Sequence, residues 1–179
     1  MPMDTMDTEI PNTPLFGGLN QDDWPELLAH VERLELQEGD KVFLQGELAD
    51  AFFVVVSGSV EVRVSQDVHG QQVLAHLSSG SVIGEGSLFL GGTHSASVYA
   101  SEPVALLCFR REEFLDLVWR LVPGAVRVLH NMAHAMAVRL RAADLEIAEL
   151  SKGHGETGVV HVLGGESHGK IPSWGWPKR

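Results

Sequence analysis

The clearest indication of the fold comes from residues 52–64, which read F-F-V-V-V-S-G-S-V-E-V-R-V. Its first part is continuously apolar and ends at Ser57-Gly58, and its second part alternates strictly between apolar and polar residues. Short apolar or alternating runs bounded by glycine and other turn residues are typical of β-strands. The run therefore predicts two strands joined by a turn.

Similar short runs recur on both sides of this segment, with turn signals between them. They lie at residues 34–36, 42–44, 73–77, 82–83, 96–100 and 104–109. About eight strands at spacings of about ten residues are typical of an antiparallel sandwich, a jelly roll or a β-roll. No helix-length segment separates the strands, so a doubly wound α/β fold is not expected.

Helical patterns flank the predicted strands on both sides. Before them, Asn20 or Asp22 can cap a helix whose apolar residues recur at helical spacing: Trp24, Leu27, Leu28 and Val31. After them, residues 112–119 indicate a short helix, Pro123-Gly124 breaks it, and a long helix follows over residues 125–150. The predicted fold is mainly β, an antiparallel jelly roll or β-roll with an N-terminal helix and a long C-terminal helix.

The long helix carries two apolar sets. One alternates four and three residues apart, which is the spacing of a coiled-coil seam: Leu129, Ala133, Met136, Leu140, Ala143, Ile147 and Leu150. The other, which we expect to face the sheet, comprises Val122, Ala125 or Val126, and Met132. A helix of about 40 Å outruns a small β domain, so we expect the seam to form a homodimer. The alternative is one broad apolar face packed on the domain.

Composition limits the classes of partner. The net charge of -11 repels phosphate backbones and acidic lipid surfaces, and no basic patch offsets it, so we expect neither nucleic-acid nor membrane binding. The N-terminus has no signal-peptide pattern and no apolar run approaches about 18 residues, which predicts a cytoplasmic protein. The single cysteine, Cys108, lies in an apolar run and is expected to be a buried structural thiol.

Three segments are predicted. Residues 1–13 read as a flexible leader, residues 14–150 as one domain that includes the dimerisation helix, and residues 151–179 as a flexible Gly- and His-rich tail, with a short hairpin at 159–163 as the alternative.

The most distinctive candidate site is V-I-G-E-G-S-L-F-L-G-G-T-H-S-A-S-V, residues 82–98. A glycine before a short helix frees backbone N–H groups, which together with the helix dipole favour an anion. Glu85 beside them suggests a ligand with hydroxyls near its phosphate. On chemistry alone, a Gly-rich turn between strands usually only reverses the chain.

The order of elements resembles the cyclic nucleotide-binding domain family, the regulatory modules of catabolite-activator-type regulators, cyclic-nucleotide-dependent kinases and gated channels. The resemblance covers about residues 15–150. It is carried by L-F-G-G-L-N before the first helix, E-G-D-K-V-F-L-Q-G-E (38–47), A-F-F-V-V-V-S-G-S-V-E-V (51–62) and H-L-S-S-G-S-V-I-G-E (76–85).

In that family residues 84–98 correspond to the phosphate-binding cassette, whose usual form is F-G-E, an apolar helical turn, a loop and R-[S/T]-A. Ile83 replaces the phenylalanine, whereas Gly84 and Glu85 match. The resemblance implies that Glu85 accepts a hydrogen bond from the ribose 2′-hydroxyl and that Ser95 contacts the cyclic phosphate. It also implies backbone donors at Gly86, Ser87 and Ala96, with cAMP or cGMP as the ligand and no cofactor.

His94 departs from the family, because it stands where the phosphate-pairing arginine is expected. An arginine supplies a permanent charge and a fork of donors, whereas a histidine offers one donor and is mostly neutral at pH 7. The lost charge-assisted bond is worth about 1.5–3 kcal/mol, or roughly ten- to a hundredfold in affinity. Gly86 also stands where the family usually has an apolar residue, and it loosens the short helix.

Two functions therefore stay open. One is a cyclic-nucleotide sensor that relays binding through its C-terminal helices, and the other is a dimeric scaffold for an unidentified protein whose pocket no longer binds nucleotide. The 29 residues after Leu150 contain only four basic side chains, so we expect no helix-turn-helix domain. No Walker loop, kinase signature or G-x-S-x-G motif is present, so we expect no enzyme.

Metal chemistry is the remaining alternative, and the sequence argues against it. A cupin-like metal site needs two histidines one residue apart, and no H-x-H occurs. His130 and His134 lie four apart but lack the glutamate of H-E-x-x-H, and His154, His161 and His168 fall in the tail. No metal site is expected.

Overall fold

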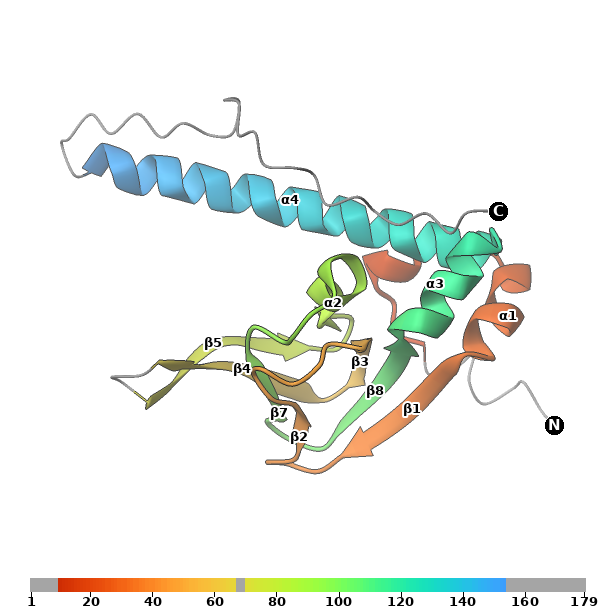
Figure 1. Cartoon of the computed structure of the whole chain (residues 1–179), viewed down its shortest axis with the longest axis horizontal. Coiled ribbons are helices and arrows are strands. Elements are labelled where there is room, and N and C mark those ends of the chain that lie inside the picture. The colour runs from red at the N-terminus through yellow and green to blue at the C-terminus, as the bar shows by residue number, and fades with distance from the viewer. Residues whose placement is uncertain (1–9, 67–69, 154–179) are drawn as a thin grey trace. The chain divides into compact units, whose positions relative to one another are not determined.

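The computed structural model describes residues 10–66 and 70–153 of the chain. Its strands form two four-stranded antiparallel sheets that make a β-roll (Figure 1). The first sheet has the order β1 (Val31–Leu36), β8 (Val104–Arg110), β3 (Ala51–Ser57) and β6 (Val82–Ile83). The second has the order β2 (Lys41–Phe43), β7 (Ser97–Ala100), β4 (Ser59–Gln66) and β5 (Gly70–Ser78). The predicted fold class is confirmed.

Strand β3 explains why residues 52–56 are continuously apolar: the strand is covered on both faces. Phe53 and Val55 lie in the core between the sheets, whereas Phe52 and Val54 lie in a second core against the helices. Strand β4 is covered on one face, so Val60 is buried while its neighbour Glu61 forms an ion pair with Arg63. Between the two strands Gly58 has φ +77°, and a Cβ there would lie 2.3 Å from the carbonyl oxygen of Pro103.

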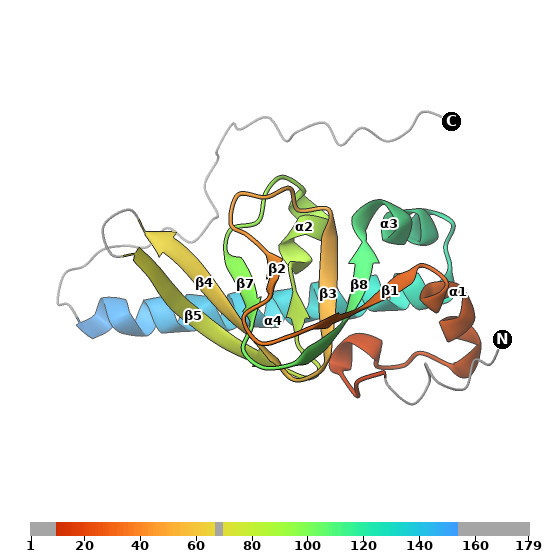
Figure 2. The same ribbon diagram turned by 90° about the horizontal axis from the view of Figure 1, so that it is seen from below.

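The helices close the outer face of the first sheet. They are the 3₁₀ turns η1 (Pro14–Phe16) and η2 (Gln21–Asp23), α1 (Trp24–Leu28), α3 (Arg111–Trp119) and α4 (Pro123–Gly153). The rings of Phe52 and Phe109 stack with centroids 4.7 Å apart, and the ring of Phe114 from α3 meets that of Phe52 edge-on at 5.2 Å. The first half of α4 adds Ala125, Val128 and Met132 to this core (Figure 2).

Three predictions at the edges of elements were wrong. Val31 begins β1 instead of extending the N-terminal helix, because its backbone pairs with Phe109 of β8. Pro123 and Gly124 lie inside the first turn of α4, where proline needs no hydrogen-bond donor. Residues 10–13 of the expected flexible leader pack on the roll: Pro11 is buried and the Thr13 hydroxyl donates to the carbonyl oxygen of Gly80 at 2.7 Å.

The chain divides into two compact units, residues 1–138 and 139–179, and the boundary falls inside α4. The predicted tail begins with helix, because α4 continues to Gly153, whereas the suggested hairpin at 159–163 lies outside the described residues. None of the helices in the described part of the chain is long and apolar enough to cross a membrane.

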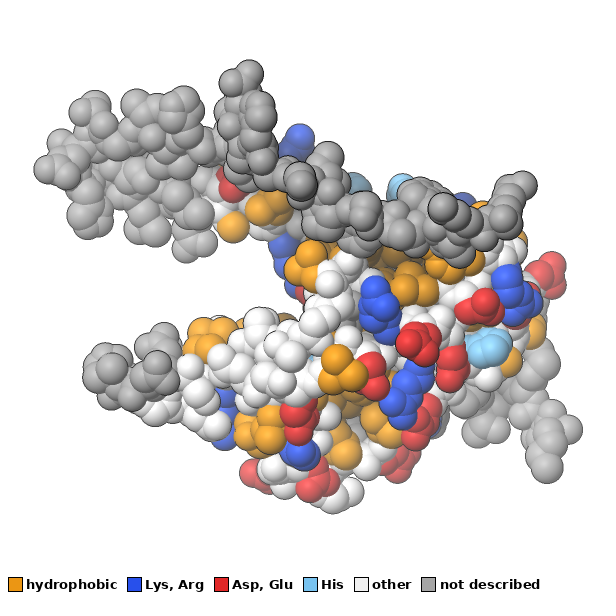
Figure 3. All heavy atoms as spheres, viewed as in Figure 1, with side chains coloured by type: hydrophobic (Ala, Val, Ile, Leu, Met, Phe, Trp, Pro, Cys, Tyr) orange, Lys and Arg blue, Asp and Glu red, His pale blue; other side chains and the backbone are white. Residues whose placement is uncertain are grey.

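Basic and acidic side chains are intermixed on the face seen in Figure 3. Several form ion pairs between elements: Arg110 of β8 lies 3.7 Å from Glu32 of β1 and 3.6 Å from Asp50, and Arg120 pairs with Glu26 of α1. Arg110 and Arg120 are therefore engaged in ion pairs with neighbouring elements.

Candidate ligand site

The candidate cassette begins where β6 ends at Gly84. Gly84 has φ +73°, and a Cβ added there would lie 3.2 Å from the carbonyl oxygen of Ala51, 3.5 Å from His94 Cε1 and 3.6 Å from Phe43 Cε1. Its backbone conformation therefore favours glycine, and the carbonyl oxygen of Ala51 leaves little room for a side chain. The turn at Gly84 leads directly into α2 (Glu85–Leu90), which places Glu85 in the first helical turn.

Helix α2 is anchored by Leu88 and, in part, by Phe89. Leu88 is buried in the core shared with β3 and the other helices, whereas Leu90 is 84% exposed. Gly86 lies inside this short helix, and a Cβ there would meet no atom within 4 Å. The predicted donors at Gly86 and Ser87 thus belong to the first turn of α2, and the Ser87 side chain lies outside the described residues.

The second half of the cassette is joined to the loop between β2 and β3 by backbone hydrogen bonds. His94 N donates to the carbonyl oxygen of Glu47 and Gly46 N donates to that of His94, both at 2.9 Å. Ala49 N donates to the carbonyl oxygen of Gly92 at 2.9 Å, on the other side of a bridge between Leu48 and Thr93. This ladder holds the His94 backbone in one place.

The imidazole of His94 is buried, with 8% of the residue exposed. It stacks on the ring of Phe43, with centroids 3.6 Å apart and planes 9° from parallel. Burial lowers the pKa of His94, and the nearby carboxylates of Asp50 and Glu47 oppose that shift without reversing it. The residue at the arginine position is therefore a neutral ring at pH 7.

The structure brings Gly84 and His94 together from the two ends of the cassette. Ser95 follows with an exposed side chain, and Ala96 is half-buried just before β7 begins. The hydroxyl of Ser95 is thus accessible, whereas the ring of His94 is largely shielded from water.

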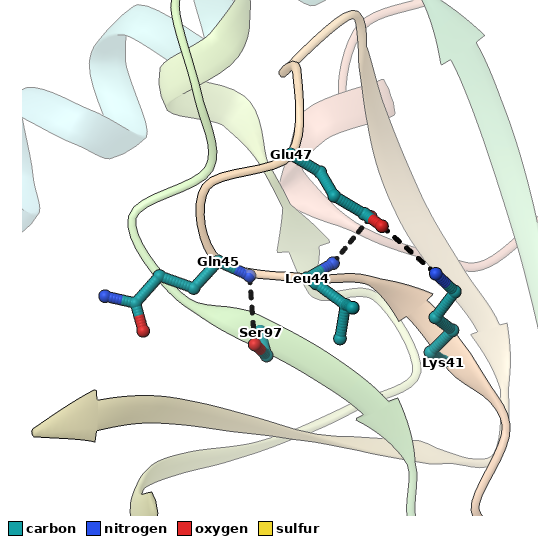
Figure 4. Close-up of polar contacts among 5 residues, drawn as sticks. All are labelled: Lys41, Leu44, Gln45, Glu47 and Ser97. Carbon is teal, nitrogen blue, oxygen red and sulfur yellow. Dashed lines mark hydrogen bonds and ion pairs between the residues drawn. The ribbon is translucent and has the colours of Figure 1, made fainter.

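Sequence reasoning missed the residues that brace the cassette from β2 and the loop after it. Gln45 N donates to Ser97 Oγ at 2.9 Å, and the Glu47 carboxylate accepts from Leu44 N at 2.8 Å and Lys41 Nζ at 3.0 Å (Figure 4). The hydrogen bond from Leu44 N, and after it the one from Lys41, lowers the pKa of the Glu47 carboxyl group. In the sequence, only the polar residues within 41–47 indicate a turn here. Their partner Ser97 lies 50 or more residues away, so no local pattern connects it with them.

An open pocket of ≈ 420 Å³ lies outside the predicted ligand contacts. It is lined by residues 48–50, 91–92 and 110–113, which belong to the β2–β3 loop, the loop after α2 and the start of α3. The lining mixes Asp50, Glu112 and Glu113 with Arg110 and Arg111. It therefore presents no single sign of charge to a ligand.

The other candidate groups bear on metal and thiol chemistry. Among the described residues no three His, Cys, Asp or Glu side chains gather closely enough to hold a metal ion. His130 and His134 are exposed on α4. Cys108 is buried between the sheets, and burial raises the pKa of its thiol to about 11, which disfavours the reactive thiolate.

The two apolar sets of α4 have different environments. Val122, Ala125 and Met132 are buried in the core, whereas Val126 is 38% exposed. Of the seam residues, Leu129 and Met136 pack partly against this core, while Ala133, Leu140 and Ala143 are exposed. The side chains of Ile147 and Leu150 lie outside the described residues.

Comparison with known proteins gives a consistent family. A model of the cyclic nucleotide-binding domain matches residues 33–120. The cyclic AMP receptor protein of Thermus thermophilus is 36% identical over 151 residues, which are 84% of this chain and 68% of the relative. Glutaminase 1 of Bradyrhizobium diazoefficiens is 31% identical over 140 residues, 78% of this chain but 22% of that enzyme.

A solved structure, that of the Thermus thermophilus catabolite activator protein, superposes with a TM-score of 0.69 at 38% identity. The match covers 78% of this chain and 63% of that one, so the chain spans less than two thirds of the solved protein.

Proposed function

This chain belongs to the cyclic nucleotide-binding domain family, and we propose that it is a regulatory sensor that takes cAMP or cGMP into its β-roll. The ribose would meet Glu85 in the first turn of α2. The cyclic phosphate would meet Ser95, the backbone amides of Gly86, Ser87 and Ala96, and the ring of His94. Binding would be relayed through α3 and α4, since both pack on the core that also holds Leu88 of α2.

The observation that carries the proposal is the packing of Gly84. Its left-handed backbone and the 3.2–3.6 Å approach of Ala51, Phe43 and His94 to a notional Cβ belong to a tightly built turn that leads into a helix with a carboxylate at its start. The name of the Thermus relative, a cyclic AMP receptor, supports the same class of ligand.

Calorimetric titration of the full chain with cAMP and with cGMP tests the proposal. We expect Glu85→Gln to weaken binding by roughly ten- to a hundredfold, because it removes a charged acceptor of about 1.5–3 kcal/mol. Glu38→Gln, an exposed glutamate in the turn between β1 and β2, is the matched control and should leave affinity unchanged. Absence of binding heat at millimolar ligand would rule out the sensor.

One observation favours a second function, a dimeric scaffold for another protein. The buried, uncharged ring of His94 stacks on Phe43 as a core residue does, and it provides no permanent cation for a phosphate. Under this alternative the chain binds no cyclic nucleotide, and the titration above separates the two.

A further inference from the structure

We propose that ligand binding in this roll takes up a proton at His94, so that occupancy of the site reports acidity together with nucleotide concentration. The inference rests on the proposed function, because it requires a phosphate beside the cassette. It goes further in assigning His94 a role in which its charge depends on the ligand.

The ring of His94 is held in place by its protein neighbours. The stack on Phe43 fixes its plane, Gly84 lies against its Cε1 edge, and two backbone hydrogen bonds tie His94 to Gly46 and Glu47. A ring held in this way lies among protein groups, with 8% of the residue exposed. Its protonation state is therefore set by the groups around it.

Carboxylates are the charged groups that contribute most directly to this environment. They are Glu47 and Asp50, and both come from the β2–β3 loop. The nearby cations are engaged, since Lys41 Nζ lies 3.0 Å from Glu47 and Arg110 lies 3.6 Å from Asp50. These pairs reduce the net field of the two loop carboxylates at His94. Desolvation consequently prevails, which lowers the pKa of His94 and leaves the ring neutral.

A cyclic phosphate changes this balance, because it carries a full negative charge throughout the physiological pH range. An opposite charge within about 4–6 Å favours the charged form of a titratable group. Among the described residues of the cassette, His94 is the side chain that can gain a positive charge beside the phosphate. The proton comes from the buffer and remains on the imidazole while the ligand is bound.

The linkage sets the direction of the pH dependence. Between the lower pKa of the free site and the higher pKa of the complex, each rise of one pH unit should weaken binding by up to about tenfold. The opposite sign, tighter binding at higher pH, would contradict a proton taken up on binding.

Calorimetry with cAMP at pH 7, repeated in buffers with different heats of ionisation, counts the protons. We expect a measurable uptake of at most one proton for the unmodified chain. We expect none for His94→Arg, whose charge is permanent and whose affinity should not vary between pH 6 and 8. His30→Gln changes a histidine that lies 3.6 Å from Glu113, outside the cassette, and should leave the uptake intact.

The outcomes separate this inference from the proposed function. Absence of any heat refutes both, whereas binding without proton uptake refutes only the inference. Uptake that persists in His94→Arg assigns the proton to another group and overturns the role of His94. If that variant does not fold, the NMR shift of His94 Cε1 in the unmodified chain decides, since it should change from the neutral to the protonated value when cAMP is added.

Discussion

His94 is a residue whose environment favours one protonation state before a ligand is present. The unfolded chain exposes the imidazole to water, where it titrates near its ordinary pKa of 6.5, while the folded chain holds that pKa lower. The unfolded state therefore binds more protons in the window just below pH 6.5. Folding becomes less favourable as the pH falls through this window, because the native ring resists the charge.

This imbalance predicts a measurable effect on the ligand-free protein. The free energy of unfolding, obtained from urea titrations at pH 7.5 and 5.5, should fall at the lower pH. His94→Gln, which cannot titrate, should show a smaller fall, and the difference between the two chains isolates His94 from the other groups. Equal falls in both would mean that His94 titrates alike in the folded and unfolded states.

The residues of the cassette differ in how far the sequence could predict them. Gly84, Glu85 and His94 lie within one short stretch, so a local pattern reveals them. No local pattern reveals Phe43, the residue on which His94 stacks. Phe43 is far from His94 in the sequence and contacts it only when β2 and the cassette fold together. Phe43 also looks like any apolar strand residue in the sequence. Its role depends on tertiary packing, which periodicity does not encode.

At the level of elements, the strands were predictable because apolar runs or apolar–polar alternation marked them in the sequence. Continuous apolar runs marked β3 and β8, which are buried on both sides, and alternation marked β4. The helix boundaries were less predictable. Val31 fits a helical spacing equally well, and only its pairing with Phe109 assigns it to β1.

Helix α2 gives a test of how glycine is used within the cassette. Gly86 has helical neighbours and open space around its Cα, so Gly86→Ala should raise the free energy of unfolding by about 0.5–1 kcal/mol. Gly84→Ala should lower it by about 1–2 kcal/mol or more, because alanine at φ +73° is strained and its Cβ would approach the carbonyl oxygen of Ala51.

Urea unfolding of the two glycine variants beside the unmodified chain measures both effects. Gly46→Ala is the matched control for backbone strain, since Gly46 has φ +87° and no atom within 4 Å of a notional Cβ. A larger loss of unfolding free energy in Gly84→Ala than in Gly46→Ala would measure the crowding by the Ala51 carbonyl oxygen separately from the backbone strain. A lower free energy of unfolding in Gly86→Ala than in the unmodified chain would show that α2 does not form as a regular helix.

At the scale of the whole molecule, the apolar surface of α4 has to be explained. Leu140 and Leu145 are 65% and 68% exposed on the same helix, although large apolar side chains favour burial. Leu140 belongs to the set spaced four and three residues apart, whereas Leu145 does not. A coiled-coil contact between two copies of the chain would cover the first and leave the second in water.

This difference gives a matched test of dimerisation. In sedimentation equilibrium the unmodified chain should have the mass of a dimer, and Leu140→Glu should shift it to the mass of a monomer, because two opposed carboxylates would be forced into the seam. Leu145→Glu adds the same charge to an equally exposed position off the seam and should leave the dimer intact. A monomeric unmodified chain, or equal behaviour of the two variants, would place the function of α4 outside self-association.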